Sequence, residues 1–216
     1  MSAERCAFAV ETTALTKIYG DKAAVKQLDL RVREGEIYGF IGRNGAGKST
    51  TLKMLCGLAS PTEGEIRLFG KPVNDSLVGQ RLGVLIESAG AYPHLTARQN
   101  VMMKAICMGL ADDKSVDEVL GMTGLADAGR KKVKHFSMGM KQRLGVALAL
   151  LGNPDMLVLD EPVNGLDPEG IRELRQLFLR LQEEGKTILL SSHILGELSK
   201  ISTSYGIIKD GEMIEQ

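Results

Sequence analysis

The glycine-rich segment that begins at Gly42 constrains this chain more than any other feature. It matches the pattern G-x-x-x-x-G-K-[ST] and reads Gly42-Arg43-Asn44-Gly45-Ala46-Gly47-Lys48-Ser49. A short apolar run, residues 37–41, precedes it, and a run with helical character, residues 50–56, follows it. In such a strand–loop–helix arrangement, glycines let successive backbone N–H groups converge on phosphate oxygens at the start of the helix. The segment therefore predicts a phosphate-binding loop.

The side chains of this loop have separate expected roles. Lys48 supplies a point charge to the phosphates, and the Ser49 hydroxyl can hold Mg²⁺. An ordinary glycine-rich turn with a solvated lysine is the alternative, but it leaves the glycines without a purpose. We expect the nucleotide to be bound by Gly42, Arg43, Asn44, Gly45, Ala46, Gly47, Lys48, Ser49 and Thr50.

Two acidic residues, Asp160 and Glu161, end a second apolar run that starts at residue 156. Open parallel sheets bind ligands at the carboxyl ends of their strands, so we expect both carboxylates beside the phosphate loop. Asp160 is suited to bind Mg²⁺ through water, and Glu161 to act as the general base on an attacking water. Taken alone, the run also fits a strand that simply reaches solvent at two charges.

The order of the apolar runs predicts an α/β fold with a mainly parallel core sheet. Runs at 156–159 and 187–190 each follow a helix-like stretch, 141–151 and 171–184, as crossover helices require. Residues 8–33 alternate in short runs around turn residues, which is typical of half-buried antiparallel strands. Residues 82–86 predict a further strand, and residues 96–125 have helical composition.

These patterns predict a single domain over residues 1–216. We expect an N-terminal antiparallel β subdomain and an inserted α-helical subdomain at about 92–152. The end of the chain, residues 206–214, predicts a hairpin around Asp210-Gly211, and we expect no regulatory domain after it.

Composition limits the class of partner. Lys plus Arg and Asp plus Glu number 27 each, which removes the general electrostatic case for binding nucleic acid. No apolar run reaches the roughly 20 residues of a membrane helix, and the N-terminus lacks a secretory signal. Cys6, Cys56 and Cys107 show no disulfide or zinc spacing, so we expect small buried hydrophobes in a reducing cytosol.

Two other sets of residues carry no motif. We expect His94 and His135 to be surface residues. The methionine-rich stretch 101–108 favours the core of the helical insertion, although methionines also suit adaptable docking grooves for proteins.

Short motifs in a fixed order resemble the nucleotide-binding domains of ATP-binding cassette (ABC) transporters, over residues of about 8–214. Residues 136–143, FSMGMKQR, resemble the family's LSGGQ signature and its basic-polar tail. Residues 164–167, NGLD, resemble the D-loop, and residues 191–193, SSH, resemble the switch histidine. Tyr19 resembles the aromatic residue that stacks on adenine; an edge-strand aromatic is the alternative.

The resemblance implies a P-loop NTPase fold and a head-to-tail dimer. Each ATP would lie between the phosphate loop of one subunit and the signature segment of the other. Ser137 and the Gly139 N–H, at the start of a helix that begins near Met140, would then cap the γ-phosphate, and Asp167 would also lie at the nucleotide. His193 would touch the γ-phosphate and Glu161; a hydrogen-bonded strand-end histidine is the alternative.

The signature departs from the family pattern at three positions, where Phe136, Met138 and Met140 replace Leu, Gly and Gln. Ser137 and Gly139, the two groups most needed for phosphate contact, remain. We therefore expect activity, with altered affinity for the closed dimer.

Glu87 stands where most cassettes place a glutamine that links Mg²⁺ to the membrane partner. We expect it to be an oxygen ligand near Mg²⁺, in addition to Ser49 and Asp160. Together with the signature, it resembles the bacitracin-export and lantibiotic-immunity group of peptide transporters. The alternative is an ordinary substitution that says nothing about substrate.

The resemblance thus implies an ATPase subunit that uses ATP and Mg²⁺, with Glu161, His193 and Lys48 as catalytic residues. It would form a homodimer, lie on the inner face of the cell membrane, and power separate permease subunits that export antimicrobial peptides or drugs. A second hypothesis is a soluble ABC ATPase acting on nucleic acid or ribosomes, but the single cassette without basic excess favours no nucleic-acid partner. A third is a nucleotide-binding scaffold without turnover, against which Glu161 and His193 count.

Overall fold

A six-stranded sheet forms the centre of the computed structural model, which describes residues 8–198 and 200–216. Its strand order is β11-β10-β4-β9-β8-β7, and every neighbouring pair is parallel except β10 and β11. The strands are β4 (Ile37–Ile41), β7 (Leu82–Leu85), β8 (Met156–Asp160), β9 (Thr187–Ser192), β10 (Ser204–Lys209) and β11 (Glu212–Glu215). All residues of β4, β8 and β9 are buried, because helices or strands cover both faces. The predicted mainly parallel core is confirmed.

The antiparallel part of the fold is larger than the sequence predicted. β1 (Phe8–Tyr19) pairs with β2 (Lys22–Leu28) and β3 (Arg31–Arg33), as the alternating pattern indicated. It also pairs with β5 (Glu63–Leu68), which in turn pairs with β6 (Lys71–Pro72). These last two strands were missed by sequence reasoning. The first three residues of β5, Glu-Gly-Glu, are all exposed, so the strand offers little apolar alternation to detect.

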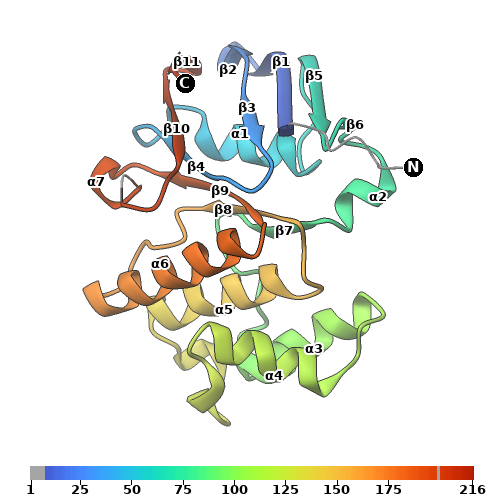
Figure 1. Cartoon of the computed structure of the whole chain (residues 1–216), viewed down its shortest axis with the longest axis vertical. Helices are drawn as coiled ribbons and strands as arrows, with labels where there is room; N and C mark the ends of the chain where they lie inside the picture. The colour runs from blue at the N-terminus through green and yellow to red at the C-terminus, as the bar shows by residue number, and fades with distance from the viewer. Residues whose placement is uncertain (1–7, 199) are drawn as a thin grey trace.

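Helices cover the parallel sheet from two sides (Figure 1). α1 (Lys48–Leu55) lies between it and the antiparallel sheet, and α5 (Met138–Leu150) and α6 (Pro168–Glu183) lie on the opposite side. α3 (Ala97–Cys107) and α4 (Asp113–Met122) lie beyond α5. Short helical segments complete the chain: α2 (Ser76–Gly79), α7 (Leu195–Leu198), η1 (Ala126–Ala128) and η2 (Val133–His135).

Successive residues of β4 face two separate hydrophobic cores. Ile37 and Ile41 pack with apolar residues of α3 to α6, whereas Tyr38 and Phe40 pack with residues of α1 and the antiparallel sheet. This alternation follows from the two-residue period of a strand. β4 is therefore anchored on both faces, and it holds the start of the phosphate loop at a fixed position.

Helix starts lie earlier than the apolar periodicity indicated. α5 begins at Met138 and not near Met140, because the Ser137 side chain accepts a hydrogen bond of 3.2 Å from the Met140 N–H and caps the helix. α6 begins at Pro168, where Asp167 accepts from the Gly170 N–H at 3.0 Å. α1 begins at Lys48. The first residues of α1 and α6, Lys-Ser-Thr and Pro-Glu-Gly, add no apolar repeat, so the sequence pattern starts late in these two helices.

The expected burial of the cysteines is wrong for Cys107, which is exposed. The buried residues of α3 are Ala97, Asn100, Val101 and Ala105, and Cys107 falls outside that stripe. Cys56 is half-buried, and burial raises the pKa of its thiol to about 12. Cys6 lies outside the described residues.

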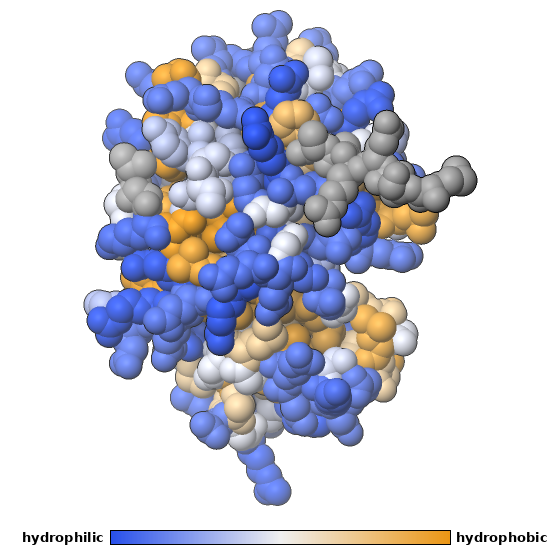
Figure 2. Space-filling model, viewed as in Figure 1, coloured by the Kyte–Doolittle hydropathy of each residue, from blue (hydrophilic) through white to orange (hydrophobic). Residues whose placement is uncertain are grey.

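The methionine-rich stretch enters the core only in part. Val101 and Ala105 are buried and Met102 packs against the core, but Ile106 and Met108 are 61% and 42% exposed. Figure 2 shows a mainly hydrophilic face on which apolar residues gather where α3 ends. His94 and His135 are exposed, as predicted. Within residues 8–198 and 200–216, no helix has both the length and the apolar character of a membrane span.

Candidate functional site

The glycine-rich loop joins β4 to α1 at the carboxyl end of the parallel sheet. Gly47 has φ +112°, and a Cβ atom there would lie 2.6 Å from the carbonyl oxygen of Ala24. A Cβ atom on Gly42 would lie 2.6 Å from the carbonyl oxygen of Ile208. Both positions therefore need glycine, because the neighbouring backbone occupies the space of a side chain.

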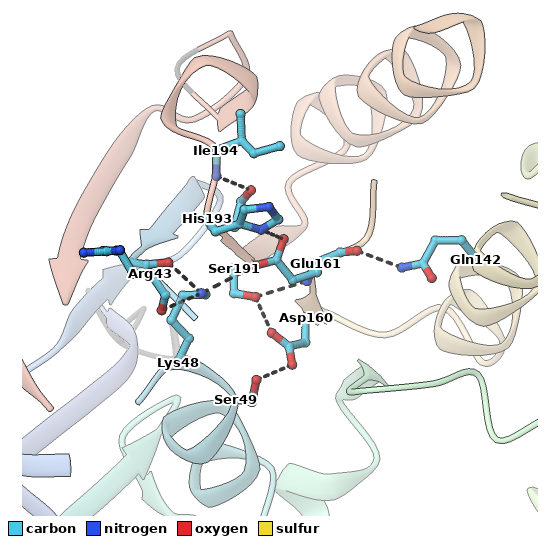
Figure 3. A network of polar contacts seen from close by, with 11 residues as sticks. Arg43, Lys48, Ser49, Gln142, Asp160, Glu161, Ser191, His193 and Ile194 are labelled. Atoms are coloured by element: carbon cyan, nitrogen blue, oxygen red, sulfur yellow. Dashed lines mark hydrogen bonds and ion pairs between the residues drawn. The ribbon is translucent and has the colours of Figure 1, made fainter. Parts of the chain in front are cut away.

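Lys48 points back into the curve of this loop (Figure 3). Its Nζ donates to the carbonyl oxygen of Gly42 at 2.7 Å and lies 3.5 Å from Oε1 of Glu161. The Lys48 side chain is only 5% exposed, and Glu161 Oε1 is buried with no hydrogen-bond partner among the described residues. A confined cation, ion-paired with a carboxylate oxygen that still lacks a hydrogen bond, fits a site for a phosphate and the water that attacks it.

Asp160 accepts two hydroxyl hydrogen bonds at the end of β8. The Ser49 hydroxyl donates to Oδ2 at 2.6 Å, and the Ser191 hydroxyl donates to Oδ1. A hydroxyl and a carboxylate are the hard oxygen donors that Mg²⁺ prefers, and Mg²⁺ completes its shell with water and substrate phosphates. The described residues contain no cluster of three or more His, Cys, Asp or Glu that could hold a metal. The Ser49–Asp160 pair could hold Mg²⁺ that also binds a substrate phosphate.

Glu161 and His193 meet although 32 residues separate them. Nδ1 of His193 lies 2.9 Å from Oε2 of Glu161, with the histidine side chain 39% exposed. Glu161 itself has φ +50°, a left-handed conformation that non-glycine residues adopt at an energetic cost. Its N–H donates to the Ser191 carbonyl oxygen at 3.2 Å, which holds this turn against β9.

A cleft of about 600 Å³ opens in front of the loop. Tyr19 stands at its border with 51% exposure, and Lys17 Nζ lies 4.9 Å from the centre of its ring. Of the described loop residues, Gly42, Arg43 and Ala46 do not line the cleft; the Arg43 carbonyl oxygen accepts from Lys48 instead, at 3.4 Å. The lining consists of Tyr19, Lys22, Ala23, Ala24, Lys26, Asn44, Gly45, Gly47, Lys48, Ser49, Thr50, Glu161 and Asp210.

Ser137, Gly139 and Asp167 do not line this cleft. Ser137 and Asp167 serve as helix caps, of α5 and α6. The first turn of α5 packs on the D-loop segment, since a Cβ atom on Gly139 would lie 3.0 Å from Leu166 Cδ2. The structure therefore places these three residues outside the chain's own cleft.

Glu87 makes an ion pair with Lys53 of α1 and does not line the cleft. Its Oε1 lies 2.5 Å from Lys53 Nζ, and this hydrogen bond raises the pKa of Lys53. The Glu87 side chain is 64% exposed, and its φ is +62°. The carboxylate expected at the metal is therefore held by a lysine one turn along the helix from Ser49.

Sequence reasoning missed several residues of the site. Ser191 was missed, but it could have been found in the same way as Asp160. β9 pairs with β8, and the two strands end at the same edge of the sheet. Lys22, Lys26 and Asp210 line the cleft from the antiparallel part and the last hairpin, and no local motif marks them. Gln142 donates from Nε2 to the Glu161 carbonyl oxygen at 3.0 Å, a contact that only the packed structure reveals.

Comparison with known proteins places the chain in a family. A profile of the ABC transporter family matches residues 25–164. The bacitracin transport ATP-binding protein BcrA of Bacillus licheniformis is 47% identical over 210 residues, which are 96% of this chain and 69% of that protein. The lantibiotic transport ATP-binding protein SrtF of Streptococcus pyogenes is 39% identical over 200 residues, or 93% of this chain and 86% of that protein.

Solved structures agree with this placement. The ATP-binding cassette MJ0796, solved as a dimer in a post-hydrolysis state bound to ADP and Pi, has a TM-score of 0.87 and 29% identity. The match covers 95% of this chain and 97% of that one. The predicted P-loop NTPase fold is thereby confirmed, as is the resemblance to bacitracin and lantibiotic transport ATP-binding proteins. The chain belongs to the ABC transporter family.

Proposed function

We propose that this chain binds and hydrolyses ATP with Mg²⁺, as one ABC ATPase domain, to power a transporter. The observation that carries the proposal is the meeting of Lys48, Glu161 and His193 beside the phosphate loop. Phosphoryl transfer to water needs a cation that holds the phosphates and a group that orients or deprotonates the attacking water. Lys48 and Glu161 are suited to these roles, and His193 lies within hydrogen-bond distance of Glu161.

In this proposal the loop and Lys48 hold the β- and γ-phosphates, and Tyr19 stacks on the adenine. Glu161 accepts a proton from the water that attacks the γ-phosphate in line. His193, 2.9 Å from Glu161, fixes the direction of that carboxylate and contacts the γ-phosphate. Ser49 and Asp160 would hold Mg²⁺, and Glu87 would lie nearby once released from Lys53. The chemistry supplied by a bound Mg²⁺ would be neutralisation of charge on the phosphates.

We infer a head-to-tail homodimer with ATP at its interface. Ser137, Gly139 and Asp167 lie outside the chain's own cleft, and a second copy placed head to tail would bring such groups to the γ-phosphate. The Ser137-capped start of α5 is suited to this task, because a helix N-terminus attracts phosphate. The dimeric state of the similar cassette MJ0796 supports a dimer here.

We further propose that separate integral-membrane permease subunits bind this dimer on the inner face of the membrane. The names of BcrA and SrtF, which are bacitracin and lantibiotic transport ATP-binding proteins, support antimicrobial peptides or related drugs as the cargo class, and we propose that this cargo is exported. Asp and Glu balance Lys and Arg at 27 each, which favours a permease over nucleic acid as the partner.

Replacing Glu161 by Gln tests this function. The amide cannot accept a proton from water, so MgATP binding should persist while phosphate release falls by about 100-fold or more. Gel filtration should then show a dimer in MgATP and a monomer without nucleotide. Lys48→Ala, which removes the phosphate ligand, serves as the non-binding control. A Glu161→Gln protein that hydrolyses ATP at the wild-type rate would refute the assigned chemistry, and one that stays monomeric in saturating MgATP would refute the dimer.

A further inference from the structure

The main chain of Glu161 is held on both of its sides. Its N–H donates to the carbonyl oxygen and to the hydroxyl of Ser191, at 3.2 and 3.1 Å. Its carbonyl oxygen accepts from the Asn164 N–H at 3.1 Å and from Nε2 of Gln142 at 3.0 Å. Because Glu161 has φ +50°, these contacts maintain a conformation that the residue does not favour on its own.

Gln142 differs from the other partners in where it comes from. Ser191 belongs to β9 and Asn164 to the loop that follows Glu161, whereas Gln142 lies on α5 (Figure 3). A rotation or shift of α5 would therefore change the hydrogen bond at the Glu161 carbonyl oxygen. That peptide unit carries the carboxylate that faces Lys48 and His193.

The same helix begins at the signature segment. Gln142 follows Ser137 by five residues, which is about 7.5 Å along a helix axis. α5 is packed along its length: Gly139 lies against Leu166, and a Cβ atom on Gly145 would meet Leu85 at 2.7 Å. A helix confined in this way moves as one body, so a displacement at Ser137 reaches Gln142.

We propose that Gln142 is a positioning residue for Glu161, and that it links the two ATP sites of the dimer. This inference rests on the proposed function, in which Ser137 and Gly139 touch the ATP bound by the partner subunit. When α5 contacts the ATP bound by the partner subunit, this contact fixes the position of Gln142. Gln142 then fixes, through its hydrogen bond, the position of the Glu161 peptide unit, and Glu161 acts on the ATP bound by its own chain. In this link, neither Gln142 nor Glu161 needs to contact the ATP bound by the partner subunit.

The test compares two glutamines with the same kind of contact. Gln182 Nε2 donates to the Gly35 carbonyl oxygen at 2.8 Å, and both glutamines are half-buried. Gly35 precedes β4, at the amino end of the parallel sheet and thus at the edge opposite Glu161. Gln142→Met and Gln182→Met each remove one amide-to-carbonyl hydrogen bond at similar volume, so they should cost similar stability.

Kinetics should separate the two variants. Gln142→Met should lower kcat for ATP about tenfold with KM within about twofold, and lower the Hill coefficient for ATP toward 1. Gln182→Met should change none of these. Gln142→Lys, which keeps an N–H donor on a chain of similar length, should recover most of the lost kcat. The positioning role would be overturned if kcat were unchanged in Gln142→Met, or if Gln182→Met lost as much kcat. The link between the two ATP sites would be overturned if Gln142→Met had a lowered kcat but an unchanged Hill coefficient.

Amide hydrogen exchange tests the positioning role without hydrolysis. In nucleotide-free protein, the amides of Glu161, Val163 and Asn164 should exchange about threefold faster or more in Gln142→Met and remain unchanged in Gln182→Met. Equal exchange rates in Gln142→Met and Gln182→Met would refute the claim that the Gln142 hydrogen bond holds Glu161. If the wild-type protein itself releases no phosphate from ATP, the proposed function fails, while this measurement still decides whether Gln142 holds Glu161.

Discussion

Replacing Glu87 by Gln tests how a carboxylate beside the phosphate site is used. The change removes the charge partner of Lys53 but keeps the length of the side chain and one oxygen. Both side chains are open to water, with 33% of Lys53 and 64% of Glu87 exposed, so the short distance of 2.5 Å does not imply a strong interaction. Pairs of this kind contribute about 0.2–1 kcal/mol.

That magnitude sets the expected change in stability. For a chain of this size, 1 kcal/mol shifts Tm by about 2–4 °C, so Glu87→Gln should lower Tm by no more than about 4 °C. The loss should shrink in high salt, because the screening length falls from about 10 Å at 0.1 M to about 3 Å at 1 M. Asp155→Asn is the matched control: Asp155 pairs with Arg81 at the same distance, 2.5 Å, with 51% and 39% exposure. It precedes β8, at the edge of the sheet opposite the site.

The effect on hydrolysis has two opposing contributions. A carboxylate near Mg²⁺ attracts the metal but repels the γ-phosphate, whereas Gln offers a neutral oxygen. We therefore expect basal ATPase within about tenfold of wild type, a barrier change of about 1.4 kcal/mol. A shift in the Mg²⁺ concentration for half-maximal nucleotide binding should appear in Glu87→Gln and not in Asp155→Asn. The larger effect should be on coupling to the permease, measured as transport per ATP hydrolysed.

One result would refute this reasoning. If basal phosphate release in Glu87→Gln vanished as completely as in Glu161→Gln, Glu87 would take part in the chemical step. Its assignment to metal contact and communication would then be wrong.

Two further predictions concern Lys48 and the cysteines. Lys48→Ala removes a 5% exposed cation from the phosphate loop, so calorimetry should detect no tight MgATP binding; undiminished affinity would contradict the phosphate-loop assignment. Cys56, whose thiol pKa is raised to about 12 by burial, should remain protonated at pH 8, because that pH lies below its pKa, and it should react with maleimide far more slowly than the exposed Cys107. Peptide mapping after brief labelling measures the two rates, and equal rates would show that the burial of Cys56 does not protect it.

The parallel core was predicted well from the sequence because β4, β8 and β9 are continuous apolar runs, and helical stretches separate these runs. β5 was missed because Glu63, Gly64 and Glu65 are exposed, so its pairing with β1 leaves no apolar signal there. β6 was missed because it has only two residues, both exposed. The predicted helices were placed correctly, but their first turns were not, since Ser137 and Asp167 act through hydrogen bonds and not through apolar spacing.

The candidate site was predictable where a motif is local or ends a strand. Lys48, Ser49, Asp160 and Glu161 are of this kind, and the structure brings them together. The pairs Lys53–Glu87 and Gln142–Glu161 join residues 34 and 19 positions apart. No spacing rule relates their partners, because the contacts arise from how α1 and α5 pack against the sheet.

The left-handed backbone at Glu161 sets stability and catalysis against each other. A glycine there would adopt φ +50° freely, and relief of such a conformation is worth on the order of 1–3 kcal/mol. The same substitution would delete the carboxylate that faces Lys48 and His193. A search for the most stable sequence on this backbone would therefore discard the residue that the proposed reaction needs most. Under the proposed role, thermostabilised variants of this protein must be screened for phosphate release and not for melting temperature alone.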